Sequence, residues 1–219
     1  MLLDLVFPRR CVVCGGDGET LCRNCDRALR RLQGGVCERC GAPTAWPVER
    51  CRECSGRRIA FAHARAAVVY DEAAKRIVGA WKERGQRSLA ELAGEIVDEV
   101  VARPNAYTLT FVPPDHNRYL RRGHNPAERL AAELGSRWQL PVLALLCRAP
   151  GVGAQRGLSL AERRRNVRGV FKATGPCPRS IVLVDDVYTS GATVSAAATA
   201  LRTAGARRIE VVTFARAVR

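Results

Sequence analysis

Hydrophobic and polar positions follow two alternating patterns along most of the chain. Short apolar runs, typical of strands covered on both faces, occupy residues 64–70, 107–113, 140–146, 181–186 and 208–216. Apolar residues at helical spacing occupy residues 71–84, 88–103, 126–138 and 194–205. The alternation of strands with helices predicts an α/β fold, in which a mainly parallel sheet carries helices on both faces.

The strand predicted at 181–186 ends in an acidic pair, and a run of small residues follows it. We expect the pair where the strand leaves the core, just before the next helix begins. Carboxylates there can accept hydrogen bonds from vicinal hydroxyls or hold a divalent cation, and the amides at the helix start attract a phosphate. A simple helix cap needs only one acid, so we predict a phosphate-sugar site. Its candidate residues are Asp185, Asp186, Thr189, Ser190, Gly191, Ala192 and Thr193.

Basic residues exceed acidic ones, with a formal net charge of +15, and most of the excess lies in residues 61–219. The segment after the strand at 107–113 contains Arg118, Arg121 and Arg122. This segment and the acidic pair both lie at the carboxyl ends of predicted parallel strands, where such sheets bind ligands. A diphosphate-binding role for these arginines is therefore favoured over a solvated basic turn.

Residues 148–172 form a long segment that contains glycines and many arginines and has little strand character. Two interpretations stay open from the residues alone. The segment can be a mobile lid that closes over an anionic substrate, or an ordinary flexible basic loop.

Eight of the ten cysteines form four CxxC motifs within the first quarter of the chain. Two CxxC turns supply the four thiolates of a tetrahedral zinc site, so we predict two structural Zn²⁺ ions, with iron as the competing metal. Consecutive pairing of the motifs gives shorter paths around each metal than interleaved pairing, and we favour it. The expected ligands are Cys11, Cys14, Cys22 and Cys25 for one ion and Cys37, Cys40, Cys51 and Cys54 for the other. The expected division is a zinc module at 1–60 and a larger domain at 61–219.

Several other classes of protein are disfavoured by the sequence. It contains no GK[ST] motif of a P-loop, and the third glycine of GVGAQRG at 151–157 comes one residue too late for a dinucleotide-binding fingerprint. It contains no apolar run of 18 residues, so we expect no membrane span. The first ten residues lack the pattern of a signal peptide. Thiolate zinc sites also indicate a reducing compartment, so we expect a cytoplasmic protein.

The segment VLVDDVYTSGAT at 182–193 resembles the phosphoribosyl diphosphate (PRPP) motif of type I phosphoribosyltransferases. By this resemblance, Asp185 and Asp186 bind the ribose hydroxyls of Mg²⁺–PRPP, and residues 189–193 bind its 5-phosphate. One departure is that purine-salvage members with an acidic proton shuttle carry that acid where this chain has Thr189.

The order of the four CxxC motifs, WKERGQRSLAELA, RYLRRGHNPAERLA, LSLAERRRNV and the PRPP motif is similar to that of the ComF family. That family is associated with natural competence, the uptake of transforming DNA, and with a phosphoribosyltransferase-like fold. The resemblance extends over the whole chain. It places five residues in motif positions that contact the diphosphate or form the lid: Lys82, Arg118, Arg122, Gln155 and Arg163. The usual Phe-Asn-Gln is replaced here by residues 124–126.

Three hypotheses about function follow. The first is a phosphoribosyltransferase, in which the acidic pair stabilises the cationic sugar while arginines stabilise the departing diphosphate. The second is a non-catalytic protein that binds single-stranded DNA through its positive charge. The third is a zinc-ribbon adaptor that docks a protein of the competence machinery, which accounts for residues 1–60 only. The acidic pair favours the first, because two carboxylates would repel DNA phosphates.

Overall fold

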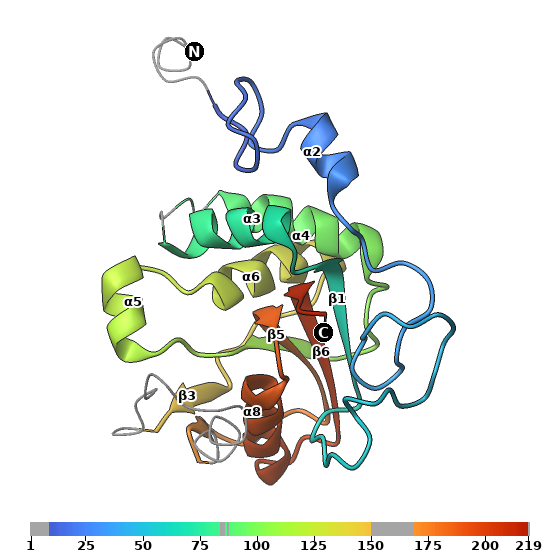
Figure 1. The fold of residues 1–219 in the computed structure, drawn as a ribbon. Coiled ribbons are helices and arrows are strands. Elements are labelled where there is room, and N and C mark those ends of the chain that lie inside the picture. The colour runs from blue at the N-terminus through green and yellow to red at the C-terminus, as the bar shows by residue number, and fades with distance from the viewer. Residues whose placement is uncertain (1–8, 84–85, 87, 150–168, 219) are drawn as a thin grey trace.

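The computed structural model describes residues 9–83, 86, 88–149 and 169–218, and its centre is a parallel β-sheet (Figure 1). The four strands lie in the order β1-β6-β5-β2, and every neighbouring pair is parallel. Their bounds are His63–Val69 for β1, Thr108–Phe111 for β2, Ser180–Tyr188 for β5 and Arg208–Arg216 for β6.

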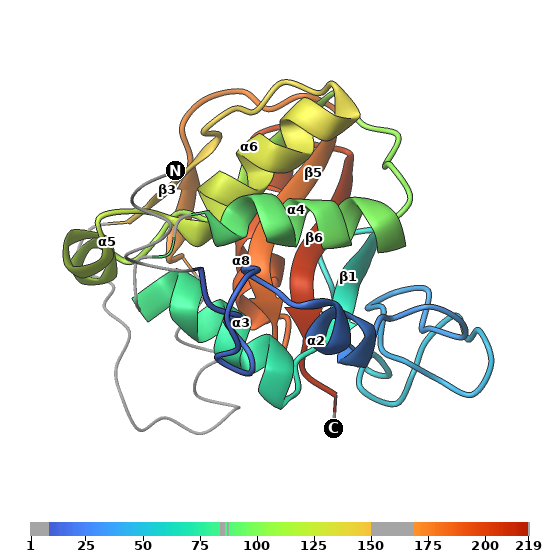
Figure 2. The ribbon, with the colours of Figure 1, turned by 90° about the horizontal axis from the view of Figure 1, so that it is seen from above.

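Both faces of this sheet are covered. Side chains alternate between the two faces along each strand, so one strand contributes to two cores. In β5, Val182 and Val184 pack into one core and Ile181 and Leu183 into the other. The first core is covered by helices α3, α4 and α6, which Figure 2 shows lying over the sheet. The second core is covered by helix α8. These helices span Glu72–Glu83, Leu89–Val100, Pro126–Trp138 and Ala192–Thr203. The predicted mainly parallel sheet with helices on both faces is therefore confirmed.

The strand predicted at 140–146 is wrong in its extent. Val142 makes one parallel bridge to Leu109, and the chain then turns away to form β3 (Leu146–Arg148), which pairs antiparallel with β4 (Phe171–Ala173). The amide of Leu145 donates to the hydroxyl oxygen of Thr110 at 3.3 Å and to the carbonyl of Leu143 at 3.0 Å. Both acceptors take the place of a ladder bond to β2, and the pairing ends after one bridge.

The segment after β2 also differs from the predicted basic loop, because it contains helix α5 (His116–Arg122). The Asp115 side chain accepts the amide of Arg118 at 3.4 Å and caps the helix start. Gly123 ends it with a left-handed backbone, φ 67°. The helix holds the three arginines on a defined surface.

The strand β5 continues two residues past the predicted 181–186, so the acidic pair lies within the strand and not at its end. Pairing with β2 stops at Val184, opposite Phe111, while pairing with β6 continues to Tyr188. Past Val184, β5 therefore keeps a neighbour on one side only. The acids lie at the carboxyl end of the shorter β2–β5 ladder, which leaves that side open for a ligand.

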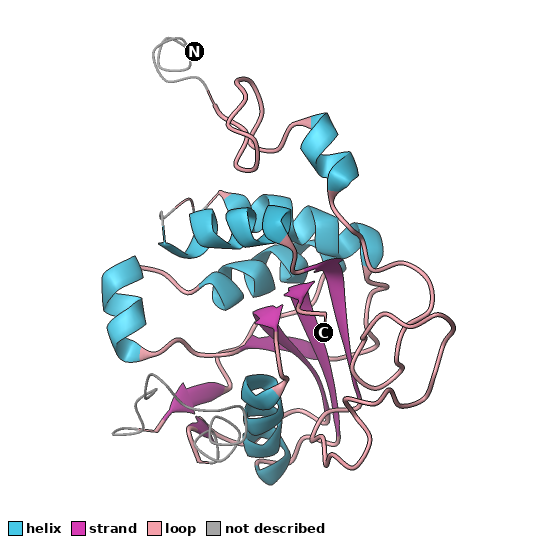
Figure 3. Cartoon of the chain, in the orientation of Figure 1, coloured by secondary structure: helices cyan, strands magenta, loops and turns pink. Residues whose placement is uncertain are grey.

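The cysteine-rich segment before β1 consists mostly of loops and turns, with one short helix, α2 (Arg23–Ala28) (Figure 3). Residues 30–32 follow the outer edge of β1, where Arg31 bridges to Val68. Further along, Cys37, Cys40 and Cys54 are buried in the same core as α8. Within the described ranges, no helix combines the length and the apolar character needed to cross a membrane.

Candidate functional site

A cleft of about 250 Å³ lies at the carboxyl ends of β2 and β5, and most of the predicted ligand residues line it. The predicted residues in its wall are Lys82, Arg118, Arg122, Asp185, Asp186, Thr189 and Thr193. They come from helices α3 and α5, strand β5, the turn before α8 and the first turn of α8. The expected convergence of the basic segment and the acidic pair is therefore present in the structure.

The two acids have different surroundings. Asp186 forms an ion pair with Lys82 from the last turn of α3, with 2.6 Å between Nζ and Oδ1. The Asp186 amide donates to Oδ1 of Asp185 at 2.9 Å. Burial, together with the charge of Asp186, raises the pKa of Asp185 to about 7, while the nearby Lys82 opposes this rise. A bound cation or a hydroxyl donor would favour the ionised form of Asp185.

The turn between β5 and α8 places a glycine at the start of the helix. Gly191 occupies the N-cap of α8 with φ 72°, a left-handed conformation that glycine adopts without strain. Having no side chain, Gly191 cannot cap the amides of the first turn, although Ser190 Oγ accepts the amide of Ala192 at 3.4 Å. The positive end of a 12-residue helix thus opens toward Thr189 and Thr193 in the cleft.

Of the three arginines on α5, two line the cleft and one does not. Arg118 and Arg122 are in its wall. Arg121 is largely exposed and pairs with Glu83 at 2.9 Å. Glu83 also pairs with Arg122, and although burial acts to raise its pKa, the two arginines hold the pKa of Glu83 below its usual value. Glu83 thereby fixes α5 against the end of α3.

Arg148 also lines the cleft, and sequence reasoning assigned it only to the start of the predicted lid. Its Nε donates to the carbonyl of Pro113 at 3.1 Å, and its guanidinium lies 4.9 Å from the ring centroid of Phe171. Burial lowers the pKa of Arg148, an effect that the charge of Asp115 opposes. Arg148 comes shortly after the apolar run at 140–146, a position that indicates the end of a strand. Because the predicted strand ends at 146, Arg148 falls in the segment that follows.

Two residues of the segment that stands in place of the usual Phe-Asn-Gln have structural roles. His124 is buried between the carbonyls of Trp81 and Arg122, each 3.0 Å from a ring nitrogen. Asn125 caps α6 by accepting the amide of Ala127 and donates to the carbonyl of Val112. Two other predicted ligands, Gln155 and Arg163, lie outside the described residues, as does most of the predicted lid.

The eight CxxC cysteines form two compact clusters of four sulfur atoms. Within each cluster the ligand atoms lie within 4.8 Å of one another. The first cluster is Cys11, Cys14, Cys22 and Cys25, and the second is Cys37, Cys40, Cys51 and Cys54. A zinc ion with Zn–S bonds of about 2.3 Å requires tetrahedral edges of about 3.8 Å. Sulfur separations of 3.8 Å for Cys14–Cys22 and 3.5 Å for Cys40–Cys51 fit this geometry. The consecutive pairing of motifs is confirmed.

The two clusters share a pattern of backbone donors to sulfur. The amide of Cys22 donates to Cys11 Sγ at 3.4 Å, and the amide of Cys51 donates to Cys37 Sγ at 3.2 Å. Burial acts to raise both pKa values, but the backbone donors outweigh it and lower the pKa to about 6 for Cys11 and about 7 for Cys37. Each cluster is thus prepared to offer a thiolate to a metal.

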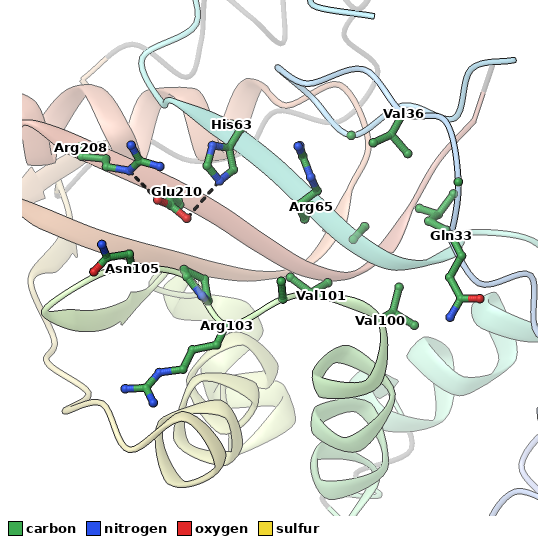
Figure 4. A pocket seen from close by; sticks show the side chains of 16 residues that line it. Gln33, Val36, His63, Arg65, Val100, Val101, Arg103, Asn105, Arg208 and Glu210 are labelled. Carbon is green, nitrogen blue, oxygen red and sulfur yellow. Dashed lines mark hydrogen bonds and ion pairs between the residues drawn. The ribbon is translucent and has the colours of Figure 1, made fainter. Parts of the chain in front are cut away.

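A larger cleft, about 540 Å³, lies at the opposite, amino end of β1 and β6 (Figure 4). Figure 4 shows His63 and Arg208 pointing toward the carboxylate of Glu210. The distances to that carboxylate are 3.0 Å and 2.6 Å. The buried acid is therefore already neutralised by its neighbours. Size alone does not make this the ligand site, because the predicted phosphate-binding residues lie at the other end of the sheet.

Comparison with known proteins finds a family model for the cysteine-rich segment and relatives that cover most of the chain. Residues 2–55 match the model of the family described as the double zinc ribbon domain. Competence protein F of Haemophilus influenzae is 30% identical, covering 96% of this chain and 98% of the relative. Competence protein ComFC of Streptococcus pneumoniae is 26% identical, covering 91% of this chain and 89% of the relative.

Among solved structures, the chain is similar to glutamine PRPP amidotransferase from B. subtilis. The match is 23% identical, covers 59% of this chain and 26% of that one, and has a TM-score of 0.39. The family assignment rests on the full-length sequence relatives and on the two four-cysteine zinc-binding clusters. By these, the chain belongs to the ComF (competence protein F) family.

Proposed function

We propose that the 250 Å³ cleft binds PRPP with Mg²⁺ and that the chain transfers the phosphoribosyl group to an acceptor nucleophile. The observation that carries this proposal is the convergence of three features on one cleft. They are an acidic pair, an open helix start and a group of cationic side chains. A phosphorylated sugar that also carries a diphosphate requires these three kinds of partner.

Each part of PRPP has a matching partner in this proposal. The 5-phosphate lies on residues 189–193 at the positive end of α8. The ribose hydroxyls donate to Asp185 and Asp186, whose oxygen atoms also suit Mg²⁺. The diphosphate lies on Arg118, Arg122 and Arg148, because guanidinium groups bind phosphate oxygens in pairs.

One cation in the cleft is incompletely satisfied without a ligand. Nε of Arg122 is buried and has no hydrogen-bond partner among the described residues. Buried donors are nearly always paired in proteins, since an unpaired one costs about 1–3 kcal/mol. A phosphate oxygen in the cleft would satisfy this donor, which supports an anionic ligand at this position.

The proposed reaction breaks the bond between C1 of the ribose and the diphosphate oxygen. The electron pair leaves with the diphosphate, and the lone pair of the acceptor forms the new bond to C1. Arginines stabilise the growing negative charge, while Asp185 and Asp186 stabilise the cationic sugar. Thr189 has no carboxylate, so the proton of the acceptor leaves by another route than in the purine-salvage enzymes with an acid at this position.

The biological setting we propose is DNA uptake, in the reducing cytoplasm where thiolate zinc sites persist. The relatives are named for competence, and the chain has a formal net charge of +15. The same charge supports the alternative function, binding of single-stranded DNA without turnover. The two functions differ in what they require of the acidic pair.

The double variant Asp185→Asn/Asp186→Asn separates them. If the acids bind ribose and Mg²⁺, titration calorimetry will show Mg²⁺-dependent PRPP affinity falling several hundredfold. Each lost charge-assisted hydrogen bond costs about 1.5–3 kcal/mol. Affinity for single-stranded DNA will stay the same or rise, and both metals will be retained.

A matched control removes two acidic charges from the exposed face of α4, by Glu91→Gln/Glu95→Gln. This control will leave PRPP affinity unchanged while removing the same number of carboxyl groups. PRPP binding by the Asp185→Asn/Asp186→Asn variant at the affinity of the unmodified protein would refute the proposed function and leave the acids as parts of the fold only.

A further inference from the structure

The second cluster, Cys37/Cys40/Cys51/Cys54, and the proposed phosphate loop, residues 189–193, lie against the same buried elements. Three of the four cysteines are buried in one core with Tyr188, which directly precedes the loop, and with α8, which follows it. Three side chains connect the second cluster to the loop: Arg216, Tyr188 and Arg57.

Arg216 is the last residue of β6, and its side chain is almost completely buried beside the second cluster. Its Nη1 donates to the carbonyl of Cys40 at 2.7 Å, and its Nη2 lies 3.3 Å from Cys40 Sγ. Nη2 also pairs with Glu53 at 3.1 Å. Four thiolates with one Zn²⁺ carry a net charge of about −2, so a buried guanidinium is the compensating charge that such a site needs.

The same guanidinium contacts Tyr188. Its central carbon lies 4.4 Å from the ring centroid, a cation–π contact, and the rings of Phe61 and Tyr188 form a T-shaped pair. The hydroxyl end of Tyr188 in turn packs on the backbone of Gly191. A Cβ added to Gly191 would lie 2.1 Å from the Tyr188 oxygen. The tyrosine therefore connects Arg216 to the N-cap of α8.

Arg57 makes a second connection. It follows Cys54 by three residues, and its amide donates to the carbonyl of Cys54 at 3.2 Å. Its Nη2 donates to the carbonyl of Ser190 at 2.8 Å, across 133 residues of sequence. Both ends of the short turn at 190–191 are therefore held by residues that the second cluster positions.

We propose that the second zinc cluster is a positioning element for the phosphate loop, acting through Arg216, Tyr188 and Arg57. This inference rests on the proposed function for its effect on PRPP and goes beyond a purely structural role for the metal. Without its metal, the second cluster would leave Cys40 and Cys54 free to move, and the two connections to residues 188–191 would loosen together.

The first cluster provides the matched control, because it has the same ligands and no such connections among the described residues. Cys51→Ser removes one ligand from the second cluster without touching Arg216, and Cys14→Ser removes one from the first. Metal content, hydrogen exchange of the amides in residues 189–195 and PRPP affinity are measured in each full-length variant. Each variant is expected to lose about one equivalent of zinc.

We expect the Cys51→Ser variant to exchange the 189–195 amides at least about tenfold faster and to bind PRPP about ten- to a hundredfold more weakly, the usual effect of losing support for a site. We expect the Cys14→Ser variant to match the unmodified protein in both measurements. Equal loop protection in the two variants, whether retained or lost, would overturn the inference.

A second pair of variants covers the case in which Cys51→Ser does not fold. Arg57→Met removes the donor to Ser190, and Arg58→Met changes the exposed neighbour. Faster exchange at 189–191 in Arg57→Met alone, with both metals retained, supports the inference, and identical exchange in the two contradicts it. If the unmodified protein does not bind PRPP, the proposed function fails while the exchange data still decide whether the second cluster orders the loop.

Discussion

The two four-cysteine clusters have the same ligands and the same donors to sulfur, but very different surroundings. In the first, Cys14 is exposed, and the segment contacts the body through Val12, Val13 and Leu21 on the α3 side. One hydrogen bond, from Arg76 to the carbonyl of Val13, adds to this contact. In the second, three cysteines are buried in the core beside α8. Figure 1 shows the first segment, in blue, on the far side of α3 from α8.

The comparison shows that one type of metal site can serve two structural purposes within a chain. The first cluster closes a short local loop, and only Cys11 of its four ligands is buried. The second lies where β6 ends and α8 begins, so its anionic charge is balanced from the body of the protein by Arg216. Burial decides the difference, because a buried charged cluster requires a charged partner, whereas water can solvate a partly exposed cluster.

The largest expected effect concerns the arginines beside the two clusters. Arg216→Met leaves the second cluster and Glu53 without their buried cation, which should lower the free energy of unfolding by about 3–5 kcal/mol. Arg31 is the counterpart near the first cluster, and its partners Asp26 and Glu99 are substantially exposed. Arg31→Met should therefore lower the free energy of unfolding by about 1 kcal/mol.

Urea unfolding of the zinc-loaded proteins measures both values, with the metal content checked before each experiment. Arg216→Lys serves as the conservative control, because it keeps the charge and loses the fork that contacts both Cys40 and Glu53. An unfolding free energy that is the same for Arg216→Met and Arg31→Met would show that the two clusters do not differ as their burial indicates.

A smaller effect separates two glycines with the same backbone conformation. Gly191 and Gly15 both have left-handed backbones, with φ of 72° and 79°. Alanine at either position incurs strain of about 1–2 kcal/mol. At Gly15 a Cβ meets open space, whereas at Gly191 it meets the Tyr188 hydroxyl. Gly191→Ala should therefore cost about 1–3 kcal/mol more in unfolding free energy, the usual range for overpacking.

The same pair of glycine variants also tests the ligand site. Gly191→Ala must displace either the loop or Tyr188, so its PRPP affinity should fall at least about tenfold, since a misplaced positioning residue commonly costs that much. Gly15→Ala lies in the first cluster and should bind PRPP normally. Calorimetry on the two variants measures this, and normal binding by Gly191→Ala would mean that the turn does not contact the ligand.

Local patterns predicted much of this molecule. The pairing of the CxxC motifs follows from short loops, and the strand at 208–216 and the helix at 126–138 have the predicted bounds. The approach of Arg118 to the acidic pair followed from a general rule about parallel sheets. Each of these depends on spacing or on topology, which the order of residues expresses directly.

The contacts between the second cluster and the phosphate loop could not be predicted in this way. Arg216 and Arg57 are ordinary basic residues in sequence, and nothing near them indicates that one is buried against Cys40 and the other reaches Ser190. Their roles depend on how β6 and the cysteine-rich segment pack together. Helix α5 was missed for a related reason: none of its residues is buried, so it has no apolar periodicity.

The smallest expected effect is a pH dependence that belongs to the ligand site and to neither cluster. Burial, with the charge of Asp186, raises the pKa of Asp185 to about 7. The acid is then about one-tenth ionised at pH 6 and about nine-tenths at pH 8. The raised pKa means that the unliganded fold favours the protonated form and loses stability as the pH rises through about 7.

Ligand binding should change in the opposite direction, because the proposed partners of Asp185, ribose hydroxyls and Mg²⁺, require its ionised form. Affinity for PRPP in the presence of Mg²⁺ should rise about tenfold between pH 6 and pH 8, in step with ionisation. The phosphates of the ligand titrate near the lower end of this range, so the Asp185→Asn variant is the necessary reference. The Cys14→Ser variant should keep the full pH dependence, because the first cluster is remote from the acid. The same slope in Asp185→Asn as in the unmodified protein would assign the whole effect to the ligand and remove Asp185 from the titration.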